Sequence, residues 1–219
     1  MAEINLLEHY PKSTRPIEER AKTVTAADRQ LSKQFGRDYF DGDRRHGYGG
    51  YRYHPRFWQL TVKRFRDHYQ LAEDAHILDV GCAKGFMLRD FKELMPKATI
   101  AGLDCSEYAI QQADEAVKPF VQMGNAVALP YSDHSFDLVV SINTLHNLSR
   151  EACQQALLEI QRVTSAHAFV MVDAWRTERE RELQRQWMLT AETYMHVDDW
   201  KRLFTEIGFT GDYYWCILE

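Results

Sequence analysis

The sequence predicts an α/β fold, built as a Rossmann-like, doubly wound and mostly parallel sheet with an N-terminal helical lid segment. Two observations carry this prediction. From residue 73 onward, short apolar runs alternate with segments of helical periodicity, and this alternation is typical of βα units around a parallel sheet. The first apolar run, ILDV at 77–80, leads into the small-residue turn GCAKG at 81–85, which is where such sheets bind ligands.

The elements of the expected core, residues 73–219, follow from length and periodicity. Ser106 and Ser149 stand where a hydroxyl can cap the first turn of a helix, and Gly208 stands where a glycine can end one. The expected strands are 76–80, 98–104, 119–125, 136–142, 167–174 and 212–218. The expected helices are 86–95, 106–117, 150–164 and 197–209.

Residues 1–72 are expected to extend this core as a lid or a substrate wall. Helices are predicted at 17–35, behind Pro16, and at 56–71, behind Pro55, because proline suits the first turn of a helix. The aromatic stretch GYGGYRYHPRFW at 47–58 lies between them. It could stack nucleic-acid bases, form a linker or wall an active site, and two glycines allow it to fold tightly.

Composition bounds the class of protein. With 219 residues and 45% hydrophobic residues, a single sizeable domain is expected. No apolar run approaches the roughly 20 residues of a membrane span, and the N-terminus lacks a secretory pattern. The four cysteines show no CxxC spacing, so we expect reduced thiols, no metal and a cytoplasmic location. The oligomeric state is left open. The cysteines are Cys82, Cys105, Cys153 and Cys216.

Charge is unevenly distributed along the chain. Residues 1–70 carry 14 Lys and Arg against 9 Asp and Glu, whereas residues 71–219 carry 13 against 23. A basic front on an acidic body suits a small anionic ligand or a carboxylate better than a long phosphate backbone. A small-molecule substrate is therefore expected, without nucleic acid. A non-catalytic nucleotide-binding or RNA-binding module is the alternative from another class.

Three features indicate a nucleoside-containing ligand. The turn has the spacing G-x-A-x-G, which departs from the G-x-G-x-x-G of dinucleotide sites and favours a ligand without a pyrophosphate. Asp104, at the end of the second strand, can accept hydrogen bonds from both ribose hydroxyls. Asn125, after the third strand, can both give and take a hydrogen bond at an adenine edge.

In order and spacing, ILDVGCAKG, GLDCSEYAI and GNAVALPYSDHSFDLVVSINTLHNL resemble the class I S-adenosylmethionine-dependent methyltransferases, over residues 73–174. The resemblance implies S-adenosylmethionine as cofactor and S-adenosylhomocysteine as product. Two departures stand out: Ala83 replaces a frequent glycine, and one clear strand follows Gly208 where the family ends with a hairpin. The implied cofactor residues are Asp79, Gly81, Cys82, Gly85, Asp104, Cys105, Asn125, Ala126 and Asn143.

The front segment FGRDYFDGDRRHGYGGYRYHPRFW at 35–58, together with SINTLHNL, TAETYMHVDDW and GFTGDY, resembles the methyltransferase unit of ovothiol synthases. That resemblance implies N-methylation of the imidazole of 5-thiohistidine. An imidazole has an unperturbed pKa of about 6.5, so its neutral lone pair needs no strong base. A small-molecule or sugar O-methyltransferase is the alternative, and would need a base such as His146.

Candidate acceptor residues come from the aromatic stretch, from the end of the fourth strand and from the insertion 175–197. Aromatic faces attract cations such as a sulfonium, and arginines such as Arg44, Arg45 and Arg52 can pair with a carboxylate. The expected substrate residues are Tyr48, Tyr51, Arg52, Tyr53, Asn143, His146, Asn147, Asp173, Trp187, Glu192 and Tyr194.

Overall fold

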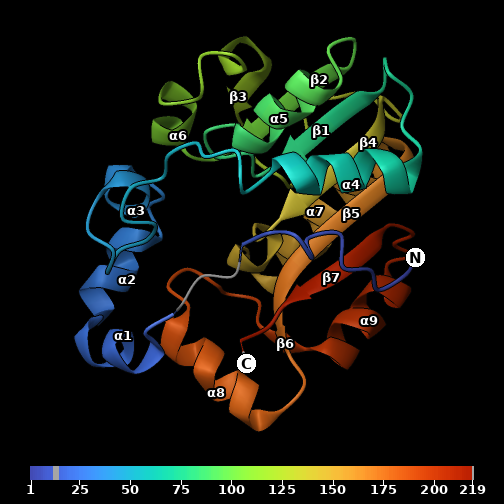
Figure 1. Cartoon of the computed structure of the whole chain (residues 1–219). Helices are drawn as coiled ribbons and strands as arrows, with labels where there is room; N and C mark the ends of the chain where they lie inside the picture. The colour runs from blue at the N-terminus through green and yellow to red at the C-terminus, as the bar shows by residue number, and fades with distance from the viewer. Residues whose placement is uncertain (12–14, 219) are drawn as a thin grey trace.

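A parallel sheet forms the centre of the computed structural model, which describes residues 1–11 and 15–218 (Figure 1). Its strand order is β3-β2-β1-β4-β5, and both β6 and β7 pair with β5. Every pairing between these strands is parallel, which confirms the predicted fold class. The strands are β1 (His76–Val80), β2 (Thr99–Asp104), β3 (Val121–Met123), β4 (Phe136–Ile142), β5 (Thr164–Trp175), β6 (Met195–His196) and β7 (Asp212–Cys216).

Helices cover both faces of the sheet, and each face has its own apolar core. On one face, α4 (Gln59–Tyr69) and α5 (Phe86–Leu94) bury residues such as Phe65 and Phe91. On the other, α7 (Arg150–Val163) and α9 (Val197–Glu206) bury residues such as Leu157 and Trp200. Because β1 is covered on both faces, its apolar run is continuous rather than alternating.

Three short helices lie apart from the sheet, beside the carboxyl ends of its strands (Figure 1). They are α1 (Ile17–Thr23), α2 (Ala26–Ser32) and α3 (Arg37–Asp41), and α8 (Glu178–Trp187) packs against α1. The short helix α6 (Glu107–Gln111) and the 3₁₀ turns Lys118–Phe120 and Leu145–Asn147 complete the described elements. We call α1–α3 and the following loop to residue 54 the lid.

Several elements end earlier than the sequence predicts. The single helix expected at 17–35 is two helices, because Thr25 and Asp28 form a reciprocal capping box that starts α2. The helix expected at 106–117 stops at Gln111. The strand expected at 119–125 covers only 121–123, since the preceding residues around Pro119 form a 3₁₀ turn. β6 and α3 were not predicted.

The outer edge of β7 is paired with the start of the chain. The amide of Ile4 donates to the carbonyl of Tyr213 at 2.9 Å, and the amide of Tyr213 donates to the carbonyl of Ala2 at 3.0 Å. Leu6, which follows this pairing, is fully buried in the core beneath α4 and α5. One strand follows Gly208, as predicted, and residues 2–4 supply its second neighbour (Figure 1).

Among residues 1–11 and 15–218, no helix is both long and apolar enough to cross a membrane.

Candidate functional site

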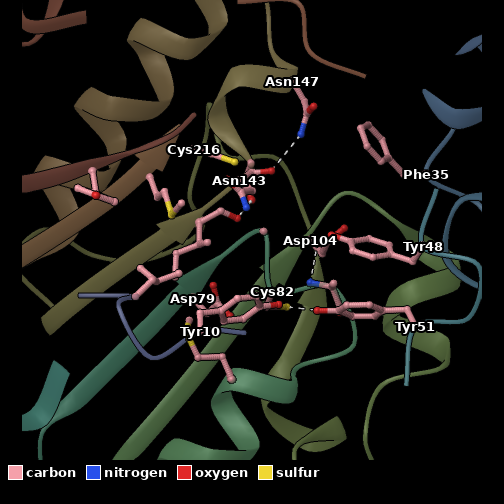
Figure 2. Close-up of a pocket in the computed structure, with 18 of the residues that line it drawn as sticks. Tyr10, Phe35, Tyr48, Tyr51, Asp79, Cys82, Asp104, Asn143, Asn147 and Cys216 are labelled. Carbon is pink, nitrogen blue, oxygen red and sulfur yellow. Dashed lines mark hydrogen bonds between the residues drawn. The ribbon is translucent and has the colours of Figure 1, made fainter. Parts of the chain in front are cut away.

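One cavity of about 780 Å³ opens at the carboxyl ends of β1, β2 and β4. This volume is within the usual range of small-molecule sites. Its position is the point where the chain reverses direction across the sheet, between β1 and β4, and this switch point is where doubly wound sheets bind ligands. Figure 2 shows its two kinds of wall: Asp79, Cys82 and Asp104 from the sheet, and Tyr48 and Tyr51 from the lid.

The turn after β1 brings bare backbone to the cavity. Gly81 has φ +88°, and a Cβ on it would lie 2.0 Å from the Thr144 hydroxyl oxygen, so no side chain fits there. Ala83, the position where glycine was expected, also has a left-handed φ of +49°. A non-glycine residue in this region is strained by roughly 1–2 kcal/mol, which is the kind of strain that functional sites hold.

Asp104 is fixed by the backbone around it. Its Oδ2 accepts from the amide of Ala83 and its Oδ1 from the amide of Ser106, both at 2.8 Å. Burial raises the pKa of Asp104, and these two amides oppose that effect. Each oxygen keeps a free lone pair, so the carboxylate can accept two further hydrogen bonds from neighbouring hydroxyls.

Asp79 is a second buried carboxyl in the same wall, at the end of β1. It is 5% exposed, and burial together with the charge of Asp104 raises its pKa to about 8. No ion pair to either carboxylate occurs among residues 1–11 and 15–218. A cation entering the cavity would therefore favour ionisation of Asp79.

The remaining predicted cofactor residues, with one exception, line the same cavity: Cys82, Cys105, Asn125, Ala126 and Asn143. The Asn125 side-chain oxygen accepts from the Val127 amide at 3.1 Å, which leaves its amide group free to donate. Asn143 has φ +53°, and its carbonyl accepts from the Asn147 side chain at 3.3 Å (Figure 2). Gly85 does not line the cavity; it starts α5 with φ +76°.

A buried lysine attaches the aromatic loop of the lid to the turn after β1. Lys84 is 6% exposed, and its ammonium donates to Asp41 at 2.6 Å and to the Tyr51 carbonyl at 2.9 Å. Asp41 also accepts from the Tyr51 amide and from the Tyr108 hydroxyl. Its pKa is lowered because these bonds outweigh the opposing effect of burial. We call Lys84, Asp41 and the Tyr51 backbone the lid latch.

The latch holds an aromatic wall over the cavity. The rings of Tyr48 and Tyr51 lie 4.4 Å apart, and Tyr51 stacks on Phe86 at 4.9 Å. Both tyrosines line the cavity, as does Asn147. Three of the predicted substrate residues are therefore brought together with Asn143.

The other predicted substrate residues do not line this cavity. Tyr53 donates to Asp90 at 2.5 Å, and Glu192 pairs with Lys33 at 2.9 Å. Arg52 is exposed, and Trp187 packs against arginines of the lid. The Tyr194 hydroxyl lies 3.5 Å from carbonyls of α8.

His146 and Asp173 are packed against each other behind the cavity wall. The His146 ring nitrogen Nδ1 accepts from the Asp173 amide at 2.9 Å, and its Nε2 lies 3.5 Å from the Asp173 carboxylate. Burial lowers the pKa of His146, and the Asp173 charge opposes it. Neither side chain lines the cavity, so the geometry favours a structural role.

Sequence reasoning missed the residues that the two ends of the chain contribute. Tyr10 and Arg15 come from the N-terminal segment, and Tyr214 and Cys216 come from β7. The period-two alternation of the predicted last strand could have placed Tyr214 and Cys216 on one face. Nothing local in the sequence indicates that Tyr10 reaches the same cavity.

Comparison with known proteins identifies the central segment. Residues 77–167 match the methyltransferase domain family. The match covers the turn after β1 and the ends of β2, β3 and β4, which build the sheet side of the cavity. This segment, less than half of the chain, is thus similar to a methyltransferase domain, and the rest of the chain lies outside the match.

Two curated relatives cover part of the chain. The demethylmenaquinone methyltransferase of Lactiplantibacillus plantarum is 35% identical over 49% of this chain and 47% of its own length. The malonyl-[acyl-carrier protein] O-methyltransferase of Legionella pneumophila is 30% identical over 65% of this chain and 48% of its own. The chain thus spans about half the length of these relatives.

A solved structure supports the fold over most of the chain. It is the complex between the Haloferax volcanii Trm112 methyltransferase activator and a methyltransferase, with a TM-score of 0.56 and 18% identity. The match covers 90% of this chain and 77% of that one.

Among residues 1–11 and 15–218, no three His, Cys, Asp or Glu side chains gather in a way that could hold a metal ion.

The lid latch gives a first prediction. Lys84→Met should destabilise the protein by about 1–3 kcal/mol, because Asp41 would lose its charged partner in a mostly buried setting. Lys97→Met is the matched control, since Lys97 and Glu73 form an exposed pair worth at most about 1 kcal/mol. Urea unfolding measures both, and equal stability of the two variants would contradict the latch.

Asp79 gives a second prediction, on pH and stability without ligand. Because its folded pKa, about 8, exceeds the unfolded 3.8, the folded state binds more protons between these values. Stability therefore falls as pH rises through this window. Asp79→Asn removes the loss, so its melting temperature should exceed that of the wild type by several degrees at pH 9, at about 2–4 °C per kcal/mol.

The gap between Asp79→Asn and the wild type should shrink at pH 5, where Asp79 is largely protonated. Asp74→Asn, at an exposed carboxylate, is the control and should track the wild type at both pH values. A gap for Asp79→Asn that does not change with pH would show that Asp79 is not the neutral buried acid described above.

Proposed function

We propose that this chain transfers the methyl group of S-adenosylmethionine to a small acceptor molecule bound in the cavity. One observation carries the proposal: Asp79, Asp104 and Asn125, each at or just after the carboxyl end of one of three neighbouring strands, line a single cavity next to the turn after β1. Their chemistry fits this cofactor, which carries an ammonium, a carboxylate, a sulfonium, a ribose and an adenine. Two buried carboxyl groups without a cationic partner suit the two cationic groups of this ligand, the ammonium and the sulfonium.

Each group of the chain would have a separate task. Asp104 would hold the ribose hydroxyls, Asn125 and Ala126 would lie at the adenine, and Asp79 would pair with the ammonium of the methionine part. When bound, the cofactor supplies an electrophilic methyl group. The rings of Tyr48 and Tyr51 would exclude water from the reacting centre. The cavity walls would hold the acceptor's lone pair in line with the methyl group, and such positioning supplies much of the rate.

The acceptor that we favour is an imidazole nitrogen of 5-thiohistidine. Its support is the resemblance of residues 35–58 to the methyltransferase unit of ovothiol synthases. A planar imidazole can stack on an aromatic ring such as Tyr51, which lines the cavity. The two curated relatives are named for other acceptors, a demethylmenaquinone and a malonylated carrier protein.

N-methylation fits the cavity better than O-methylation. A hydroxyl acceptor needs a base, and His146, the candidate from the sequence, does not line the cavity. A neutral imidazole needs none near pH 7. The excess of acidic residues after residue 70 supports a small molecule over RNA as the substrate. We also propose a cytoplasmic location, because the cysteine pattern of the sequence favours reduced thiols.

Asp104→Ala tests the cofactor site. It removes two charge-assisted hydrogen bonds, each worth about 1.5–3 kcal/mol, so affinity for S-adenosylhomocysteine should fall at least tenfold. Titration calorimetry measures the affinity, and circular dichroism checks the fold. Glu107→Ala, at an exposed residue of α6, should bind like the wild type. Unchanged affinity in Asp104→Ala would refute the assignment of the ribose.

Methyl transfer to a panel of acceptors tests the rest of the proposal. The wild type should methylate 5-thiohistidine, with S-adenosylhomocysteine formed in equal amount. Histidine, a nucleotide sugar and a short RNA complete the panel. Methylation of the sugar hydroxyl alone would overturn the acceptor and keep the enzyme class. Turnover of the RNA alone would overturn the small-molecule assignment.

A further inference from the structure

Three arginines, two from the lid and one from the segment just ahead of it, surround one tryptophan. The guanidinium carbon of Arg20, in α1, lies 4.3 Å from the centre of the Trp187 ring. Those of Arg44, in the loop after α3, and Arg15, ahead of α1, lie at 5.4 and 5.6 Å. Trp187 is the last residue of α8. The contact between α1 and α8 is thus built around a group of like charges.

This arginine cluster, Arg15, Arg20 and Arg44 around Trp187, has no acidic partner in the part of the chain that the structure describes. None of the three guanidinium groups forms an ion pair with a carboxylate of residues 1–11 or 15–218. Arg20 is 7% exposed, and its buried Nε has no hydrogen-bond partner there. Burial and the charges of Arg44 and Arg29 lower the pKa of Arg20 to about 10.

An unpaired buried cation is unfavourable unless something compensates it. The face of Trp187 does so in part, because its ring electrons attract the guanidinium groups. Contact with a ring face leaves the N–H groups at the guanidinium edge, where they can bind oxygens as a planar fork. An oxyanion at this edge would satisfy Arg20 and offset the repulsion among the three cations.

The arginine cluster reaches the cavity through Arg15. Arg15 lines the cavity, together with Tyr10 and Cys216. Burial raises the pKa of both Tyr10 and Cys216 to about 12, and the nearby charge of Arg15 opposes it in each case. These residues come from the two ends of the chain and not from the cofactor residues that follow β1–β3. A ligand group held by Arg15 would therefore lie apart from the ribose and the adenine, and the S-adenosylhomocysteine titration below distinguishes an oxyanion of the acceptor from the carboxylate of the cofactor.

We propose that Arg15, Arg20, Arg44 and Trp187 form an oxyanion subsite at the edge of the cavity, which binds the carboxylate or phosphate of the acceptor. The assignment to the acceptor rests on the proposed methyltransferase function; anion binding itself does not. A carboxylate and a phosphate share the chemistry that an arginine recognises, because each presents two or more anionic oxygens on one side. The acceptor class is thus an organic acid or a phosphate ester.

Anion titrations without cofactor test the subsite. Sodium phosphate and sodium acetate are added to the wild type at constant ionic strength, with sodium chloride as the reference, and binding is followed by calorimetry and melting temperature. At least one of the two oxyanions should bind and raise the melting temperature, and chloride should not. Preference for acetate indicates a carboxylate acceptor, and preference for phosphate indicates a phosphorylated one; either supports the subsite.

Arg20→Gln and Arg15→Gln should each weaken this binding at least tenfold. Arg45→Gln is the matched control, because Arg45 is an exposed lid arginine that already pairs with Asp43. If Arg20→Gln fails to fold, Arg15→Gln at the cavity wall still decides the question. Equal loss in Arg45→Gln, or unchanged binding in Arg15→Gln, would overturn the subsite.

A parallel titration with S-adenosylhomocysteine separates the two proposals. The arginine variants should bind it as the wild type does, since the arginine cluster shares no residue with the cofactor wall. Cofactor binding without any oxyanion binding would overturn the subsite and leave the methyltransferase proposal intact. Oxyanion binding without any cofactor binding would overturn the methyltransferase proposal and leave the anion site.

Discussion

Two buried carboxyl groups at the ends of adjacent parallel strands are the constraint on which the rest of this structure depends. Asp79 is the next-to-last residue of β1, and Asp104 is the last residue of β2. The parallel register of β1 and β2 brings both to the same edge of the sheet. Burial and, after it, the charge of Asp104 raise the pKa of Asp79, so it is unfavourable for both groups to be ionised together. The surrounding apolar core, buried on both faces of β1, maintains their proximity.

The lid is arranged so that it leaves this charge unneutralised. Lys84 is the buried cation nearest in sequence to Asp79, but its ammonium is directed to Asp41 and the Tyr51 carbonyl. The Ser106 hydroxyl makes a second contact with the N-terminal region, by donating to the Phe35 carbonyl at 2.6 Å. The hydrogen bonds of Lys84 and Ser106 thus join that region to the turns that position Asp104. The cavity is thus lined by two buried carboxyl groups, by aromatic rings of the lid and by Arg15.

The sequence was most informative where a short segment contains its own signal. Asp104 ends an apolar strand, and the turn after β1 and Asn125 each follow one, so a local pattern is enough to predict that they share an edge of the sheet. Residues placed by long-range packing gave no such signal. Tyr10 depends on the pairing of residues 2–4 with β7, and Arg20 and Trp187 depend on the contact of α1 with α8. His146 and Glu192 are candidates by residue type alone, and the fold directs their side chains to Asp173 and Lys33.

Proton release on cofactor binding tests the central claim most directly. At pH 6.5, Asp79 should be protonated in the free protein, and the amino group of S-adenosylmethionine, an α-amine with a pKa of about 7.7–8.0, should be charged. Pairing the two requires Asp79 to ionise, so binding should release close to one proton. Calorimetry in two buffers of different ionisation enthalpy gives that number, and Asp79→Asn should abolish the release. Binding of the cofactor with no proton released by the wild type would contradict the account.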